Sequence, residues 1–141
     1  MSIADFFRRI FGICRTQPPT DTACWRVVDG NVEIDLSRSV ELRQPNGAIR
    51  LEGKSLPVRL LVFRGEDGQF HAFPNRCTHV GHRRLDPLPG RNCVQCCSVG
   101  QSVFDYQGNR QSGTASEPIR PLPVLQREDT LMIDLGSFNA D

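Results

Sequence analysis

Residues 63–82 read FRGEDGQFHAFPNRCTHVGH, and here the clearest hairpin signal of the chain runs into a cysteine–histidine pair. It predicts the turn and return strand of a β-hairpin, because the glycine-bounded segment 65–68 follows a run rich in β-branched and aromatic residues at 58–63. Directly after the return strand, Cys77 and His79 offer a thiolate and an imidazole two residues apart. One loop can direct both side chains at a single centre, so the stretch predicts half of a metal site.

A second cysteine-rich stretch, CVQCCSVG at 93–100, follows ten residues after the first. It contains three of the six cysteines, Cys93, Cys96 and Cys97, and it comes after a turn signal at 87–90. Thiolates are the preferred ligands of zinc, copper(I) and iron–sulfur clusters, and imidazole suits zinc and iron. The two stretches therefore predict two loops that close on one metal centre, and their spacing alone does not indicate which metal.

The chain from Trp25 onward is typical of short strands separated by turns. In addition to the hairpin above, we expect strand–turn–strand units at 25–36, 40–53 and 103–113 and a last strand at 130–135. No internal repeat is present, and only the N-terminus shows a helical period. Many short strands at this spacing predict an all-β domain built as a small sandwich or barrel.

Residues 1–15 differ from the rest because their apolar residues recur with the period of a helix. Ser2 and Asp5 fit an N-terminal capping pattern. The apolar positions on the predicted helix are Ile3, Phe6, Phe7, Ile10, Phe11 and Cys14.

The sequence thus predicts three parts: an amphipathic helix at 1–15, a linker at 16–22 and one domain at 23–136. In the simpler interpretation, the helix packs its apolar face on its own domain. In the alternative, residues 2–14 dock peripherally on a membrane surface or on a partner, since Phe and Ile oppose Arg.

Composition excludes several classes of protein. The 141 residues carry 17 Lys and Arg against 16 Asp and Glu, and this balance gives no basis for binding nucleic acid. No convincing secretion signal follows Arg8–Phe11, and no run approaches the ~18 apolar residues of a membrane span. We therefore expect a cytoplasmic protein, in which clustered cysteine and histidine indicate metal binding rather than disulfides.

The sequence resembles the Rieske family of [2Fe-2S] domains over about residues 58–135. The stretch quoted above resembles the first cluster loop and its lead-in. CCSVGQSVFDYQGNRQSGTASEPIRPLPV, at 96–124, resembles the second loop, the following strands and the proline-containing segment that covers the cluster. The resemblance implies a Rieske-like antiparallel β-sandwich or barrel with a small two-loop subdomain that binds a [2Fe-2S] cluster through loops at about 77–82 and 93–101.

In that family two cysteines bind one iron and two histidines bind the other. The resemblance implies that Cys77 is a thiolate ligand and His79 an imidazole ligand. The second loop departs from the pattern, because it has no histidine. This departure leaves the ligands from the second loop open.

Three registers are available for the second loop. If Cys96 is the loop cysteine, Val99 takes the histidine position; if Cys97 is that cysteine, Gly100 takes it. Neither valine nor glycine can ligate through its side chain. A third register counts from Cys93 and places Cys96 at the histidine position, but it shortens the loop spacing.

The simplest repair uses the additional thiol and predicts Cys3His1 ligation by Cys77, His79, Cys96 and Cys97. Cys93 and His82 are less favoured as ligands. We expect His71, Cys14 and Cys24 to be structural, with the last two far from both loops. The alternative is a degenerate site that binds zinc or nothing.

The resemblance implies a ferredoxin-like one-electron carrier that serves a separate enzyme. Rieske oxygenases have a second domain with a 2-His-1-carboxylate iron site, and three histidines in this chain do not provide one. A thiolate in place of an imidazole, and Phe104 where high-potential members have tyrosine, both predict a lowered potential. The alternative function is a non-redox scaffold or regulatory subunit.

A basic rim flanks the predicted cluster loops and suggests a redox partner that is acidic at its docking face. In another interpretation the rim is ordinary solvated charge. Its members are Arg76, Arg83, Arg84 and Arg91.

Overall fold

The computed structural model describes residues 2–78 and 82–136. Within these residues the chain forms one short α-helix, three 3-10 turns and eleven strands. Their bounds are α1 Ile3–Ile10, β1 Trp25–Val28, β2 Asn31–Asp35, β3 Ala48–Leu51, β4 Leu60–Arg64, β5 Phe70–Pro74, β6 Leu85–Leu88, β7 Cys93–Cys96, β8 Val103–Asp105, β9 Arg110–Ser112, β10 Val124–Arg127 and β11 Thr130–Asp134, with 3-10 turns at Thr22–Cys24, Leu36–Arg38 and Val40–Arg43.

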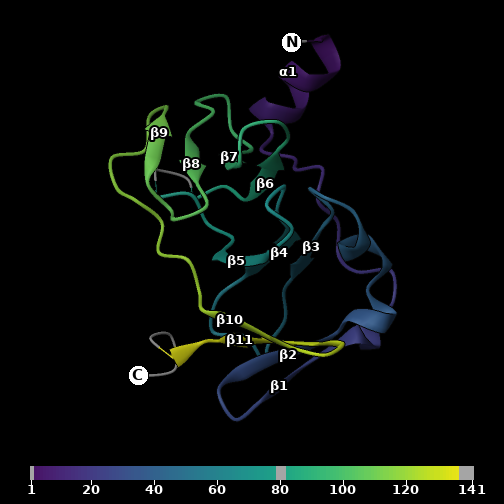
Figure 1. Ribbon diagram of the computed structural model, residues 1–141. Coiled ribbons are helices and arrows are strands. Elements are labelled where there is room, and N and C mark those ends of the chain that lie inside the picture. The colour runs from purple at the N-terminus through teal and green to yellow at the C-terminus, as the bar shows by residue number, and fades with distance from the viewer. Residues whose placement is uncertain (1, 79–81, 137–141) are drawn as a thin grey trace.

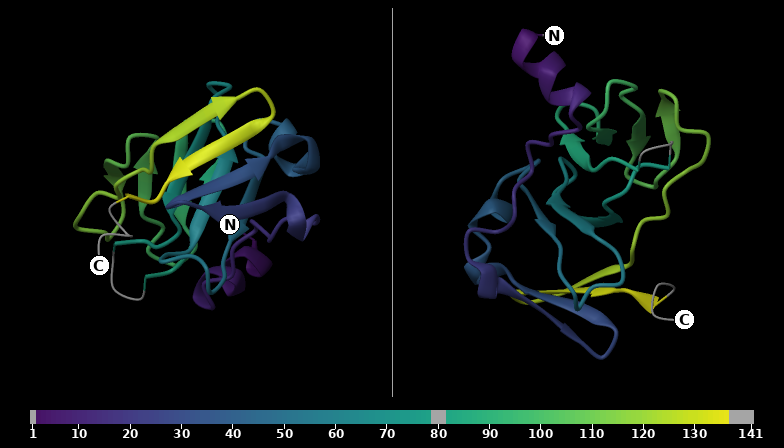
Figure 2. Two further views of the ribbon diagram at one scale, coloured as in Figure 1. Left: turned by 90° about the horizontal axis from the view of Figure 1, so that it is seen from below. Right: turned by 180° about the vertical axis from the view of Figure 1, so that it is seen from behind.

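The strands pair antiparallel in three sheets, with the orders β1-β2-β11-β10, β3-β4-β5 and β6-β7-β8-β9. Figure 1 shows the β3–β5 sheet lying between the other two, and the view from behind in Figure 2 agrees. Helix α1 lies at the end formed by the β6–β9 sheet. The predicted all-β antiparallel architecture with one short N-terminal helix is confirmed.

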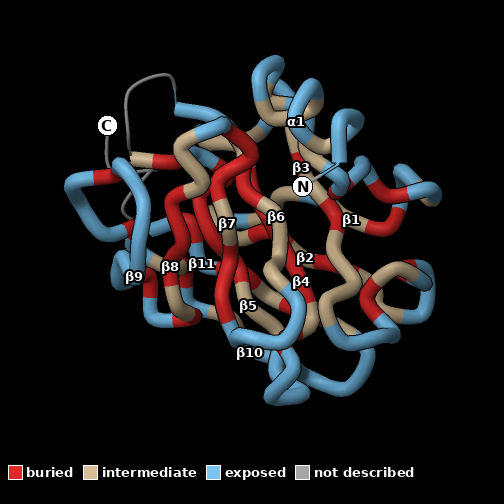
Figure 3. The backbone as a smooth tube through the Cα atoms, turned by 90° about the horizontal axis from the view of Figure 1, so that it is seen from above, coloured by how far each residue is buried: buried red, intermediate tan, exposed pale blue. Residues whose placement is uncertain are grey.

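Strand β4 explains how one sheet supports two cores. Successive side chains of a strand point to opposite faces, and the apolar run of β4 is buried on both. Leu60 and Val62 belong to the hydrophobic cluster against the β1-β2-β11-β10 sheet. Leu61 and Phe63 belong to the cluster against the β6–β9 sheet. The tube in Figure 3 shows these central strands as mainly buried, with exposed loops around them.

The predicted hairpins form where turn residues interrupt the apolar runs. β1 pairs with β2, β4 with β5, and β8 with β9. The unit predicted at 40–53 is wrong in its first half, because Val40–Arg43 is a 3-10 turn and only β3 is a strand. The amide of Leu42 donates to Ser39 O within this turn. Because that amide is used locally, it does not pair with a neighbouring strand.

The N-terminal helix begins as the sequence predicts, with the Ser2 side chain accepting from the Asp5 amide at 3.1 Å. The interpretation that α1 packs its apolar face on the domain is wrong, because no residue of α1 is buried. Among the described residues, no helix has the length and apolar character needed to cross a bilayer. The boundaries of the linker and of the following domain stay predictions.

Candidate metal centre

Two loops meet at the end of the β6–β9 sheet. The first follows β5, and the second spans 97–102 between β7 and β8. Backbone hydrogen bonds hold their ends: the Cys77 amide donates to Arg83 O at 2.7 Å, and the Cys96 amide donates to Ser102 O at 2.7 Å. A third bond, from the amide of residue 97 to Arg84 O at 3.0 Å, joins the second loop to the end of the first.

Two of the predicted cysteine ligands are buried in the apolar core next to these loops. Cys77 and Cys96 are each 0% exposed and belong to the same hydrophobic cluster as Phe73, Leu85 and Phe104. A dry apolar wall strengthens electrostatic interactions at any bound metal group and limits the access of water. His79, the third predicted ligand, lies outside the described residues.

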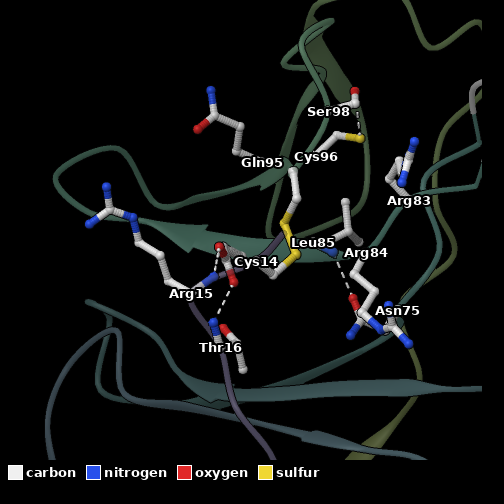
Figure 4. Close-up of a disulfide and its surroundings, with 12 residues drawn as sticks. Cys14, Arg15, Thr16, Asn75, Arg83, Arg84, Leu85, Gln95, Cys96 and Ser98 are labelled. Carbon is white, nitrogen blue, oxygen red and sulfur yellow. Dashed lines mark hydrogen bonds between the residues drawn. A yellow bond between two sulfur atoms is a disulfide. The ribbon is translucent and has the colours of Figure 1, made fainter. Parts of the chain in front are cut away.

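Cys97 has a different neighbour from the one that the sequence predicted. Its sulfur is bonded to that of Cys14, with 5.4 Å between the two Cα atoms. Figure 4 shows this disulfide on one side of the loop and the Cys96 sulfur directed toward Ser98 on the other. The expectation that Cys14 lies far from both loops is therefore wrong. A disulfide sulfur is not a thiolate, so Cys97 as a ligand stays a prediction that requires this bond to be reduced.

The second loop offers no side-chain imidazole at either position that the sequence analysis considered. Val99 is 53% exposed. A Cβ on Gly100 would lie 2.6 Å from Thr114 Oγ1, so this position is also sterically restricted. Cys77 and Cys96 are thiols of the kind that hold a [2Fe-2S] cluster, and the second loop does not supply the second histidine of the usual ligand set.

The less favoured candidates occupy the periphery. Cys93 begins β7, donates to Arg91 O at 3.2 Å, and has a raised pKa because it is buried. His82 is exposed, and its Nδ1 lies 3.1 Å from Cys77 O. His71 lies on β5, where it pairs with Asp67 at 3.0 Å, in keeping with a structural role.

Cys24 ends the 3-10 turn directly before β1, and the sheet that contains β1 lies at the opposite end of the molecule from the two loops (Figure 1). It is 2% exposed, and burial raises the pKa of its thiol. A buried thiol of this kind packs as a small apolar side chain, in keeping with the structural role that the sequence predicts.

A carboxylate bridge positions the segment between the loops. Glu52 accepts from Arg84 Nε at 2.5 Å and from Arg50 Nη1 at 3.3 Å. Burial raises the pKa of Glu52, but the hydrogen bond from Arg84 and the charges of Arg84, Arg50 and Arg59 outweigh it, so its pKa lies below the usual value. One member of the predicted basic rim is thus engaged in structure, whereas Arg76 and Arg91 are exposed.

The proline-containing segment joins both loops from one side. Thr78 Oγ1 donates to Glu117 O at 2.6 Å, and the Ala115 amide donates to Ser102 Oγ at 2.9 Å. Further along, the amide of Ile119 donates to a carbonyl in the turn between β8 and β9 at 2.8 Å. These bonds hold the segment against both loops, and its place over a bound cluster stays a prediction.

Sequence reasoning missed three residues at this site. Ser98 is 8% exposed, and its Oγ lies 3.2 Å from Cys96 Sγ. Asp86 accepts from the amides of Arg15 at 2.8 Å and Thr16 at 2.9 Å, which holds the N-terminal segment beside β6. Cys14 was treated as part of an apolar helix face. Its distance from the second loop along the chain left no signal for a bond, although an odd third cysteine in that loop could have indicated one.

Comparison with known proteins agrees with the geometry. The family model for the Rieske [2Fe-2S] domain matches residues 31–124. The structure is similar to the plasma membrane Rieske protein of Synechocystis PCC 6803, at 16% identity and a TM-score of 0.51, over 62% of this chain and 86% of that one. It is also similar to the ferredoxin of carbazole 1,9a-dioxygenase from Nocardioides aromaticivorans IC177, at 15% identity and a TM-score of 0.51, over 64% and 86%.

A third similar structure belongs to a longer protein. The quaternary ammonium Rieske monooxygenase CntA, in complex with gamma-butyrobetaine, is 25% identical with a TM-score of 0.52. The match covers 72% of this chain and 31% of the monooxygenase chain. No curated protein sequence matches the chain. At identities below 25%, the first two likenesses show the fold alone.

Proposed function

Because this chain belongs to the Rieske [2Fe-2S] domain family, we propose that it is a one-electron carrier with a cluster between its two loops. The observation that carries the proposal is the burial of Cys77 and Cys96 in one apolar cluster at the ends of both loops. A bound [2Fe-2S] cluster would supply the one-electron chemistry. The chain's own part is to hold the cluster, exclude water from it and set its potential.

The proposed ligands are Cys77, His79 and Cys96, with Cys97 as the fourth. Cys96, and not Cys97, belongs to the same hydrophobic core cluster as Cys77. This favours the register that places Val99 at the histidine position. Cys97 is bonded to Cys14, so it must first be released. A dithiol would transfer two electrons and two protons to this disulfide, giving two cysteine thiols and becoming a disulfide itself.

This ligand set supports a potential below that of centres with two histidines. A thiolate in place of a neutral imidazole adds negative charge and so disfavours the reduced cluster. Phe104, at 0% exposure, has no hydroxyl to donate to a cysteine sulfur. Ser98 acts in the opposite direction, because its hydroxyl can donate to the Cys96 sulfur.

We propose that the chain passes its electron to a separate enzyme rather than acting on a substrate. The domain that matches the family covers most of the chain, and the basic rim contains the exposed residues Arg76 and Arg83 in the first loop and Arg91 in the turn between β6 and β7. Such a rim would attract a redox partner with an acidic docking face and speed its association at low salt.

A second candidate is a non-redox scaffold or regulatory subunit. It is favoured by the Cys14–Cys97 disulfide, which removes the fourth sulfur while the second histidine is missing. Zinc in place of the cluster has no support from the comparisons.

Metal analysis separates the two candidates. The full chain is prepared without oxygen, with a dithiol present, and assayed for iron, sulfide and visible absorbance. The carrier predicts about two irons and two sulfides per chain, lost in Cys77→Ser and Cys96→Ser. Cys93→Ser is the matched control, because this thiol is also buried but lies outside the proposed set. Colourless protein without iron would refute the carrier and support the scaffold.

A further inference from the structure

Helix α1 presents its apolar side to solvent. None of its residues is buried, although it contains two isoleucines and two phenylalanines. Together with the residues that follow it, the exposed large apolar side chains are Ile3 at 77%, Phe6 at 48%, Phe7 at 55%, Ile10 at 41%, Phe11 at 63% and Ile13 at 55%. A contiguous exposed group of this size on a small domain marks a surface that meets another apolar phase.

The polar side of α1 faces the domain instead. Asp5, Arg8 and Arg9 are all partly buried. Arg9 donates to Gln95 Oε1 at 3.1 Å and to Cys96 O at 3.4 Å. The three polar side chains also line a cavity of about 590 Å³ between the N-terminal segment and β6 and β7. The orientation is therefore the reverse of that in a helix which packs on its own core.

Covalent and polar contacts fix this orientation. The disulfide anchors Cys14, four residues after the helix ends, to the second loop. Arg83 Nη1 donates to Phe11 O at 3.0 Å. Asp86 accepts from two consecutive amides, those of Arg15 and Thr16. The helix cannot turn its apolar side inward without breaking these contacts, so the exposed face is a property of the folded chain.

The same end of the molecule is strongly basic. Residues 2–15 and 76–91, which meet at this end, contain seven arginines and two aspartates, a net charge of +5. The whole chain carries only +1, so the remainder carries −4. The apolar helix face thus lies beside two positively charged segments, and the balancing negative charge is carried by the rest of the chain.

We propose that this end docks on an anionic lipid surface, with the apolar side of α1 inserted at the level of the headgroups. A short amphipathic helix lies in the interface in this way, and nearby arginines attract anionic lipids. A second copy of the chain is disfavoured, because docking would bring two ends of +5 together. The outward face is made mainly of six large apolar side chains, which suits acyl chains better than the mixed surface of a protein partner.

Docking would place the cluster loops beside the membrane, since Arg9 contacts the carbonyl of Cys96. The inference goes beyond the electron-carrier proposal and does not depend on it. A chain without a cluster retains α1, the disulfide and the arginines, so failure to bind lipid and failure to bind iron are separate results.

The test is sedimentation of the full oxidised chain with phosphatidylcholine vesicles, with and without phosphatidylglycerol. The wild type should sediment with the anionic vesicles, and added salt should release it. Phe7→Ser should weaken binding about tenfold, because a buried phenylalanine contributes about that factor. Leu125→Ser is the matched control, since Leu125 is equally exposed, at 52%, on β10 at the other end.

Two charge-reversal variants test the role of the arginines. Arg91→Glu should weaken binding to anionic vesicles about fivefold, whereas Arg127→Glu, on β10, should not. Unchanged binding by Phe7→Ser, or no binding by the wild type, would overturn the proposal. Sedimentation equilibrium without lipid tests whether another molecule binds the α1 face. A dimer that Phe7→Ser abolishes would assign the face to a second copy of the chain. A monomer that ignores both kinds of vesicle would leave a protein partner as the occupant and refute lipid docking.

Discussion

The side chains of Cys96 and Cys97 lie on opposite sides of the second loop. Cys96 is buried with Cys77 in the apolar cluster beneath the loops, and Cys97 is bonded to Cys14 of the N-terminal segment. Adjacent residues in an extended chain point in opposite directions, so the two sulfurs face different parts of the molecule. The bond to Cys14 therefore connects the position of α1 with the availability of a fourth sulfur ligand.

Removal of this disulfide should destabilise the chain. Cys14→Ser should lower the free energy of unfolding by about 2–4 kcal/mol, because the bond closes a long loop in the unfolded chain. The loop spans a sequence separation of 83 residues. Denaturant unfolding without reductant measures the effect. With reductant, the free energy of unfolding of the wild type should fall to that of the variant. If reductant leaves the stability of the wild type unchanged, the disulfide is contradicted.

Ser98 should raise the potential of a bound cluster. A metal-bound Cys96 sulfur has no proton, so the hydroxyl at 3.2 Å must donate to it and thereby stabilise the reduced state. Ser98→Ala should lower the midpoint potential by roughly 40 mV for a contribution of about 1 kcal/mol. Ser55→Ala, on an exposed turn, is the control. An unchanged or raised potential in the Ser98 variant would exclude this hydrogen bond.

The Glu52 bridge should make stability depend on pH. The pKa of Glu52 is lowered in the folded chain, so its contribution is fully present above the usual glutamate range near 4.3 and is lost as pH falls through the lowered value. Glu52→Gln should cost about 0.5–1 kcal/mol at neutral pH and almost nothing in acid. Thermal unfolding across pH measures this, with exposed Glu128→Gln as control. A cost that persists unchanged in acid would refute the ion-pair explanation.

Gly108 should be intolerant of a side chain. Its φ is +88°, and a Cβ would meet the carbonyl oxygen of Ile119 in the covering segment. Gly108→Ala should lower the free energy of unfolding by about 2–4 kcal/mol, from the left-handed backbone and the backbone clash together. Gly68→Ala is the matched control, because φ is +80° there and nothing lies within 4 Å. Equal costs for the two variants would show that the clash is relieved.

Sequence patterns predicted the parts of the fold that depend on local chemistry. The alternating and continuous apolar runs located β4 and β5, and Ser2 located the start of α1. Patterns at 40–53 failed because glycine and proline signal a turn without showing whether the preceding residues extend or coil. The pairing of three separate sheets also depends on contacts distant in sequence.

The sequence offers a single choice of cysteine in the first loop and several choices in the second. Cys77 is the single cysteine of the first loop, whereas the three cysteines in 93–97 allowed several registers for the second loop. The bond from Cys97 to Cys14 could not be deduced from spacing, because connectivity depends on where the chain folds. The orientation of α1 could not be predicted from the sequence either. Its periodicity defines an apolar side, and only the contacts of Arg9 show which side faces the domain.

A redox titration of the anaerobic, dithiol-treated chain across pH, followed by electron paramagnetic resonance, tests the electron carrier directly. We expect a one-electron centre with a midpoint potential below the range of about −150 to +300 mV found for centres with two histidines. At most one pH-dependent transition should appear, since His79 is the single proposed imidazole ligand. A high potential with two acidic transitions, or no one-electron signal at all, would contradict it.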